Sequence, residues 1–245
     1  MEQGLPRTPL NGSALVGLLA QLGLVDAQPA KPSFIEGMGR WLGWADAIPL
    51  SAALQSAPAA AASPAKPLRT ARPGPALDRE FARVQASLRS LIEDDSQPAL
   101  TDADFPSYRR RYIHLQQAMQ ASIAALRAQA RTAVARLSPA LGQLAAIDAV
   151  MDEALAEREQ ALLTLMPALL QKHFERLHQA DQHASITEPP PVGAPAQPTS
   201  NKFSNVWIKT FRHDMKRMLL AELDLRLQAT QGLLEAAAHH PTEHP

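Results

Sequence analysis

Few residues of this chain have the types and spacing that catalysis requires. The sequence contains no cysteine, which excludes thiol nucleophiles, thiolate metal sites and disulfides. It also lacks the GxSxG, HExxH, Walker and GxGxxG motifs that place a nucleophile, a zinc ion or a phosphate. Gly37-Met-Gly39 is only a fragment of a nucleotide-binding loop. We therefore expect a protein that is not an enzyme and that needs no cofactor.

One pair of residues has the spacing of a metal-binding helix. Glu175 and His178 are three positions apart, as are the inward-facing Glu and His ligands of di-iron helical bundles. Such a site needs two of these pairs and two further glutamates, and this chain has a single pair near a helix end. His239, His240 and His244 would bind a metal only adventitiously. The sequence therefore predicts no metal site.

The largest concentration of like charge is basic. Residues 106–137, 139–182 and 205–238 are expected to be helices, and an up-down-up arrangement would bring their basic residues to one end. That end would gather Arg109, Arg110, Arg111, Lys172, Arg176, Lys209, Arg212, Lys216 and Arg217, with His114, His173, His178 and His213 beside them. It could bind phosphates, anionic lipid or an acidic protein surface. The alternative is a solvated helix surface whose Arg and Lys stems cover the edges of the core.

Aromatic residues lie close to this basic end in the sequence. Nucleic-acid-binding proteins use such side chains to stack on single-stranded bases, and those near the basic residues are Tyr108, Tyr112, Phe174, Trp207 and Phe211. The whole chain has 24 basic and 24 acidic residues, so its net charge indicates neither nucleic acid nor membrane as a partner. Nucleic-acid binding would therefore depend on this local cluster.

Composition predicts that helices carry these residues. Ala, Leu, Gln, Arg and Glu dominate, only 4% of residues are aromatic, and the chain has 11 glycines. This composition is typical of helical bundles and coiled coils. The 21 prolines lie mainly outside the periodic segments, where they mark helix ends and linkers. The sequence therefore predicts a soluble all-α protein.

Two long helices are predicted on either side of Ser138-Pro139. Ser is a good N-cap and Pro is favoured at the first helical position, so a second helix begins here. Apolar residues recur every three or four positions from Tyr108 to Leu137, which is typical of a coiled-coil-like seam. The predicted seam of the second arm is Leu141, Leu144, Ile147, Met151, Leu155, Leu162, Leu165, Leu169, Phe174 and Leu177, with a kink at Pro167.

The charges of the two arms favour an antiparallel hairpin. Folding the chain back at residues 138–139 places Arg127 and Arg131 of the basic first arm beside Asp148 and Asp152 of the second. One exposed ion pair contributes only about 0.2–1 kcal/mol, but the set favours this register over others. The alternative is one continuous, kinked helix with solvated charges.

The remaining chain divides by composition. Residues 1–57 are predicted to form an N-terminal helical subdomain, 58–76 a Pro/Ala-rich linker, 77–185 the hairpin region with a preceding helix, 186–204 a Pro-rich linker, and 205–245 a C-terminal helix with a frayed tail. The hairpin and the C-terminal helix should form an elongated three-helix bundle, because the second linker is long enough to cross the bundle end.

An apolar run near the N-terminus has two interpretations. Residues 14–27 could be the core and cleavage site of a secretion signal, or an uncleaved helix with Leu15, Leu18, Leu19 and Leu22 on one face. Gln21 interrupts the run and favours the helix. No stretch reaches the roughly 20 apolar residues of a membrane span. Together with the absence of cysteine, this leads us to expect a cytoplasmic protein.

The most distinctive short string is Trp41-Leu-Gly-Trp44. A helix predicted to begin at Ser33 places Trp41 on one face with other apolar residues, and Trp44 lies one turn further on. Two tryptophans near an N-terminus more often anchor a helix to a core or a partner than bind a ligand. Trp41 and Trp44 are therefore candidate partner-binding residues.

Three segments together resemble a known group of proteins. They are Arg7-Thr-Pro-Leu-Asn-Gly12, Arg40-Trp-Leu-Gly-Trp-Ala-Asp-Ala-Ile48 and Tyr108-Arg-Arg-Arg-Tyr112. They resemble an uncharacterised proteobacterial protein family of unknown function, over most of the chain outside the two linkers. The genes of that family tend to lie beside genes for flagellar-stator-like or OmpA-like envelope proteins. The resemblance therefore implies an accessory role there and no catalytic residue.

These observations favour a non-enzymatic helical adaptor or scaffold that binds another protein, as an accessory to a bacterial envelope or stator-like assembly. The expected contact surfaces are the Trp41/Trp44 helix and any apolar stripe that the bundle leaves uncovered. The alternative is nucleic-acid or anion binding at the basic bundle end. It would depend steeply on salt concentration and on Arg109, Arg110 and Arg111.

Overall fold

The computed structural model describes residues 14–25, 43–55, 73–95, 104–187 and 206–239. All regular structure in these ranges is helical, which confirms the predicted all-α fold. The helices are α1 (Ala14–Gln21), α3 (Trp44–Gln55), α4 (Pro73–Glu93), α5 (Phe105–Ala135), α6 (Pro139–Thr164), α7 (Met166–Thr187) and α9 (Val206–His239). Within the described ranges, none of these helices has the length and apolar content that crossing a bilayer requires.

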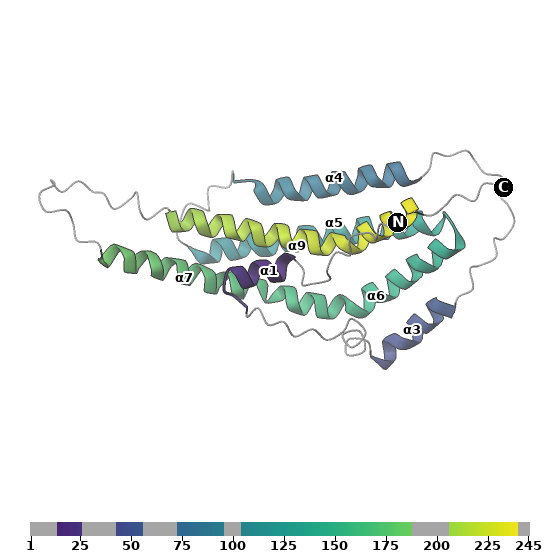
Figure 1. Ribbon diagram of the computed structural model, residues 1–245, viewed down its shortest axis with the longest axis horizontal. Coiled ribbons are helices and arrows are strands. Elements are labelled where there is room, and N and C mark those ends of the chain that lie inside the picture. The colour runs from purple at the N-terminus through teal and green to yellow at the C-terminus, as the bar shows by residue number, and fades with distance from the viewer. Residues whose placement is uncertain (1–13, 26–42, 56–72, 96–103, 188–205, 240–245) are drawn as a thin grey trace, which may run out of the picture.

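The long helices α4, α5 and α9 and the bent rod of α6 and α7 lie along the long axis of the molecule (Figure 1). The central pair is α5 and α9, which run in the same direction; α4 packs against both, and so does the bent rod of α6 and α7. The predicted bundle of hairpin and C-terminal helix is thus joined by α4. Its apolar stripe, with Leu77, Leu88 and Ile92 buried, explains why it packs on the bundle rather than standing apart.

The predicted fold-back at Ser138-Pro139 is confirmed. Ser138 has extended backbone angles (φ −160°, ψ 160°), and its hydroxyl accepts a hydrogen bond of 3.2 Å from the N–H of Leu141. Pro139 occupies the first turn of α6, where its missing N–H costs no helical hydrogen bond. The chain therefore reverses between α5 and α6 by ordinary N-terminal capping.

The two short helices pack on different rods of the bundle. α1 lies on α9 and buries Leu15, Leu18 and Leu19 of its predicted face, while Leu22, the fourth residue of that face, is partly buried. α3 lies on α6, where the amide of Gln143 donates to the carbonyls of Ala53 and Leu54 at the end of α3. Residues 33–42 of the helix predicted from Ser33 lie outside the described residues, and α3 begins at Trp44.

The second arm of the hairpin presents a different face to the core than its apolar spacing predicts. Leu162 and Leu165 belong to the predicted seam, yet they are 67% and 58% exposed, while Leu163, Met166 and Leu170 are buried. Neighbouring helix positions differ by about 100° around the axis, so the core meets the adjacent line of residues. The seam prediction was wrong here because Asp148 and Asp152, on the core-facing line, turn toward arginines of α5.

The neighbouring residues Leu162 and Leu163 test which side of α6 faces the core. Leu163→Ala should lower the free energy of unfolding by about 2–5 kcal/mol, because it removes a buried side chain and leaves a cavity. Leu162→Ala should change it by less than about 0.5 kcal/mol, because that side chain is largely in solvent. Urea denaturation monitored by circular dichroism would measure both. A larger effect at Leu162 than at Leu163 would contradict the register.

Candidate binding groove between α5 and α6

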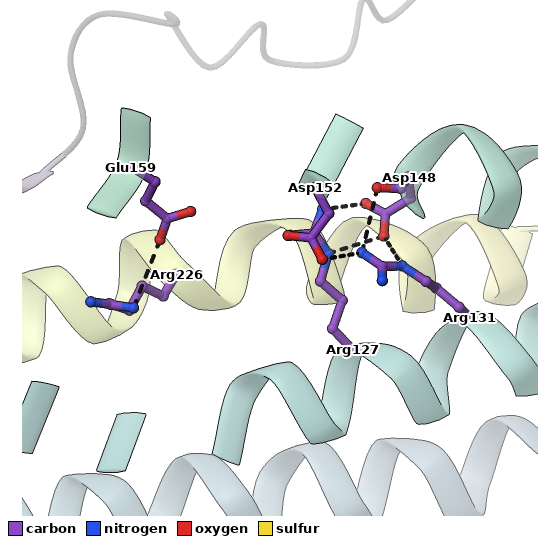
Figure 2. Close-up of polar contacts among 6 residues, drawn as sticks. All are labelled: Arg127, Arg131, Asp148, Asp152, Glu159 and Arg226. Atoms are coloured by element: carbon purple, nitrogen blue, oxygen red, sulfur yellow. Dashed lines mark hydrogen bonds and ion pairs between the residues drawn. The ribbon is translucent and has the colours of Figure 1, made fainter. Parts of the chain in front are cut away.

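Four charged side chains join α5 to α6 in the middle of the hairpin. Arg127 and Arg131 stand one turn apart on α5, opposite Asp148 and Asp152, which stand one turn apart on α6 (Figure 2). Each arginine binds both aspartates, with N–O distances of 2.5–2.6 Å. The predicted ion pairs of the fold-back are therefore confirmed, in the form of a single closed cluster of four residues.

This arginine–aspartate cluster changes the acidity of its best-buried carboxylate. Burial by itself would raise the pKa of Asp148, but hydrogen bonds from Arg127 and Arg131, with their charges, hold that pKa below its usual range. The side chain of Asp148 is only 14% exposed, so solvent screens these interactions weakly. The cluster therefore favours ionised Asp148 at neutral pH.

A second polar group lies deeper, between α5 and α9. The carboxylate of Glu222 is fully buried; it accepts hydrogen bonds from the hydroxyl of Tyr112 (3.0 Å), the amide of Gln116 (3.1 Å) and the guanidinium of Arg226 (2.9 Å). Burial, followed by the charge and hydrogen bond of Glu222, raises the pKa of Tyr112 well above its ordinary value of 10.0. The tyrosine hydroxyl therefore keeps its proton and donates a hydrogen bond to Glu222.

The same amide supports the bend between α6 and α7. A helical N–H bonds the carbonyl four residues earlier, and Pro167 has no N–H to offer the carbonyl of Leu163. Gln116 supplies the missing donor, with its Nε2 atom 3.1 Å from the Leu163 oxygen. The predicted effect of Pro167 is thus observed, and one side chain of α5 satisfies both the bend and Glu222.

Between these two polar groups a groove opens to solvent. It has a volume of about 520 Å³ and lies between α5 and α6, with Arg226 of α9 at its floor. Alanines at positions 124, 149 and 156 leave this space, because their side chains are too short to fill the gap between the helices. The other lining residues are Gln120, Ile123, Arg127, Arg131, Asp152, Glu153, Glu159 and Gln160.

A family model described as "Protein of unknown function (DUF3348)" matches residues 1–239. The chain belongs to the DUF3348 family. This match confirms the resemblance to a family of unknown function that the sequence segments indicated. No curated protein and no solved structure matches the chain.

Several basic residues of the DUF3348 chain bind the C-terminal end of α4. Arg212 and Lys216 contact the carboxylate of Asp95 at 3.1 and 2.6 Å, and Arg111 donates to the carbonyl of Asp94. The hydrogen bond from Lys216 holds the pKa of Asp95 below its usual range. The predicted basic end therefore includes the carboxylate of Asp95, just after α4, which sequence reasoning did not place there.

Two more of the predicted basic residues surround a buried His–Asp pair. His173 Nε2 lies 2.8 Å from Asp214, while its Nδ1 faces Arg176 at 2.8 Å; Arg217 lies 3.6 Å from Asp214. Because a guanidinium can only donate, His173 Nδ1 accepts and its Nε2 carries the proton toward Asp214. The remaining basic residues lie on the exposed surfaces of three helices: Arg109 and Arg110 on α5, Lys172 on α7 and Lys209 on α9.

The aromatic residues beside this end form core. Phe211 packs edge-to-face against Tyr108 and Phe174, with ring centroids 5.0 and 4.9 Å apart, and Phe174 meets Trp207 at 5.1 Å. Tyr112 is fully buried as well. These rings fasten α5, α7 and α9 together and are not available to stack on bases. The expectation of a base-stacking surface was wrong because the same rings are the largest apolar groups that the core can bury.

The other candidate residues are placed as follows. Glu175 accepts a hydrogen bond from Gln171, while the His178 ring packs on Trp207 at 5.0 Å. No group of three or more potential metal ligands occurs within the ranges that the structure describes. Trp41 lies outside those ranges; Trp44 begins α3, but its side chain is likewise outside the description.

Sequence reasoning missed Gln116 and Glu222. A signal for Glu222 exists, because it lies beside Leu223 and one turn from Met218 and Leu219, on the apolar stripe of α9. An acid on such a stripe indicates a buried, paired carboxylate. No comparable signal marks Gln116, whose role depends on the bend of another helix.

The lowered pKa of Asp148 predicts a pH-dependent contribution to stability. A carboxyl group with a depressed folded-state pKa stabilises the fold above its unfolded pKa, near 4, and loses this effect as pH falls through the folded-state value. Asp148→Asn should therefore lower the free energy of unfolding by about 1.5–3 kcal/mol at pH 7. The difference from wild type should shrink as the pH falls below about 4.

Asp224→Asn is a suitable control, since Asp224 forms an exposed ion pair with Arg89 (47% and 41% exposed). It should cost less than about 1 kcal/mol. Urea titrations at several pH values would measure both variants. A loss at Asp148 that is the same at pH 3 and pH 7 would contradict the ion-pair explanation.

The double role of Gln116 predicts a second matched pair. Gln116→Ala should lower the free energy of unfolding by about 1–3 kcal/mol, because it leaves the Leu163 carbonyl and part of Glu222 without donors. Gln117→Ala, at the exposed neighbouring position, should change it by less than about 0.5 kcal/mol. Thermal and urea melts would compare them. Equal effects would show that the bend does not depend on Gln116.

Proposed function

We propose that this DUF3348 chain is a non-enzymatic helical adaptor that binds another protein at the α6–α7 bend. The observation that carries the proposal is the leucine patch, Leu162 and Leu165, which are 67% and 58% exposed one turn apart. Single exposed leucines are ordinary in proteins, but these two belong to the apolar stripe that the bundle leaves uncovered. Burying the exposed parts of both against a partner would contribute about 2–4 kcal/mol before the costs of association.

The occupant that this patch suits is an amphipathic helix of the partner. Leucines at positions i and i+3 present one apolar ridge, which is the spacing that helix-in-groove contacts use. Exposed Glu157 and Arg158 precede the patch and supply a polar rim of mixed charge. Leu162 and Leu165 do not line the groove between α5 and α6, so the patch is a surface of its own on the outer side of the rod.

The chemistry of the groove supports binding rather than catalysis. Its lining contains no histidine and no hydroxyl side chain among the described residues, and its aspartate, Asp152, is bound by Arg127 and Arg131. We place the adaptor in the cytoplasm, which the absence of cysteine supports, as an accessory to an envelope or stator-like assembly, which follows the resemblance. The basic bundle end receives no such support, because α4 and the His173–Asp214 pair engage most of it.

The test is comparative affinity capture from the source cells, with membranes solubilised in mild detergent. Leu162→Glu/Leu165→Glu places charge on the patch, and both sites are exposed enough to leave the fold intact. Val206→Glu is the matched control, since Val206 is 59% exposed at the start of α9. We expect at least one protein to be recovered with wild type and with Val206→Glu and lost with the double variant. Identical recoveries from all three would contradict the proposal.

A further inference from the structure

Arg226 is almost fully buried but only partly satisfied. Its side chain is 8% exposed, and its Nε and Nη2 atoms donate to one oxygen of Glu222 at 3.1 and 2.9 Å. Its Nη1 atom forms no hydrogen bond with any residue that the structure describes. The carboxylate of Glu159 approaches Nη1 to 3.8 Å, which is an ion pair beyond hydrogen-bond distance. The two N–H groups of Nη1 are therefore open to an acceptor that enters the groove.

These donors belong to a residue that lines the groove. Arg226 is the one lining residue from α9, and Figure 2 shows Glu159 reaching toward it from α6, apart from the arginine–aspartate cluster. Arg127 and Arg131 also line the groove, but Asp148 and Asp152 already bind them. Arg226 is the most buried of the three cations, with 8% of its side chain exposed against 15% and 20%, and it has no aspartate partner in this cluster.

We propose that the α5–α6 groove is a binding site for a carboxylate group, which takes the Nη1 edge of Arg226 in place of Glu159. A guanidinium holds a carboxylate through short, charge-assisted hydrogen bonds that a contact of 3.8 Å does not make. Glu159 is 47% exposed and can turn into solvent, where a surface ion pair of its kind is worth at most about 1 kcal/mol. The exchange of one carboxylate for another leaves the charge of the groove unchanged.

The size and lining of the groove define the ligand further. A volume of about 520 Å³ lies within the range of about 300–1,000 Å³ that ligand sites occupy. The alanines and Ile123 suit an aliphatic stem, while Asp152 and Glu153 repel a second negative charge. The site therefore fits a single carboxylate on a short aliphatic stem rather than a phosphate. The side chain of an acidic residue in a partner protein and a free monocarboxylate share this chemistry.

The experiment follows the arginine side-chain Nε–H signals of the ¹⁵N-labelled full chain by NMR during titration. The probes are butyrate and the blocked peptide acetyl-Ala-Glu-Ala-Ala-amide, with the Lys version of that peptide as a control. We expect at least one acidic probe to shift the Arg226 signal in a saturable manner, and the Lys peptide to shift nothing. Binding by the peptide alone would indicate a partner's side chain, and binding by butyrate a free carboxylate. Either result supports the site.

Three variants locate the binding. Glu159→Gln removes the competing carboxylate and should tighten binding, by about fivefold if the displaced ion pair is worth ~1 kcal/mol. Glu157→Gln, two positions away and outside the groove lining, should leave binding unchanged and serves as the matched control. Ala156→Leu fills the groove without altering charge and should abolish binding. It leaves Arg226 and Glu222 intact, so the fold is retained.

Several results would overturn this site. They are no shift with either acidic probe, equal affinities for the Glu159 and Glu157 variants, a stronger response to the Lys peptide, or undiminished binding by Ala156→Leu. The groove site does not depend on the leucine patch. It therefore stands or falls separately from the adaptor proposal.

Discussion

The fully buried carboxylate of Glu222 constrains the whole bundle. A charge removed from water costs several kcal/mol unless donors surround it, and these come from Tyr112 and Gln116 of α5 and from Arg226 of α9 itself. A one-turn slip of α5 against α9 would move Tyr112 and Gln116 away from Glu222 and leave its charge without their hydrogen bonds. At the apolar positions of the two helices, the same slip would only replace one apolar contact by another. The polar centre thus specifies the register of the two central helices more sharply than their leucines do.

The bend of the α6–α7 rod is tied to the same point. Gln116 donates both to Glu222 and to the Leu163 carbonyl, which Pro167 leaves without a helical partner. On one side of this junction the rod follows the aromatic core of Tyr108, Phe174 and Phe211. On the other side α6 meets α5 through charged residues and alanines, and the groove opens. The exposed leucines lie at the junction because the rod turns its polar line inward.

Periodicity and charge were sufficient for much of this architecture. The spacing of apolar residues predicted the long helices, Ser138-Pro139 predicted the reversal, and the arginines and aspartates of the two arms predicted their register. Two expectations about function did not take the tertiary structure into account. The predicted basic end consists of residues from three helices and does not include α4, so the prediction omits the carboxylate of Asp95 that binds Arg212 and Lys216. The aromatic residues were expected on a surface. They lie in the core because they are the largest apolar side chains of a chain that has few of them.

By itself, then, the sequence of this DUF3348 chain determined which segments are helical and where the hairpin turns, because these depend on local spacing and on capping chemistry. It could not determine which line of α6 faces the core, since the leucines and the aspartates compete for that place. Only the tertiary structure shows that the aspartates face the core, because burying Arg127 and Arg131 requires carboxylates opposite them. The exposed leucine patch, the groove and the half-satisfied edge of Arg226 all follow from that choice.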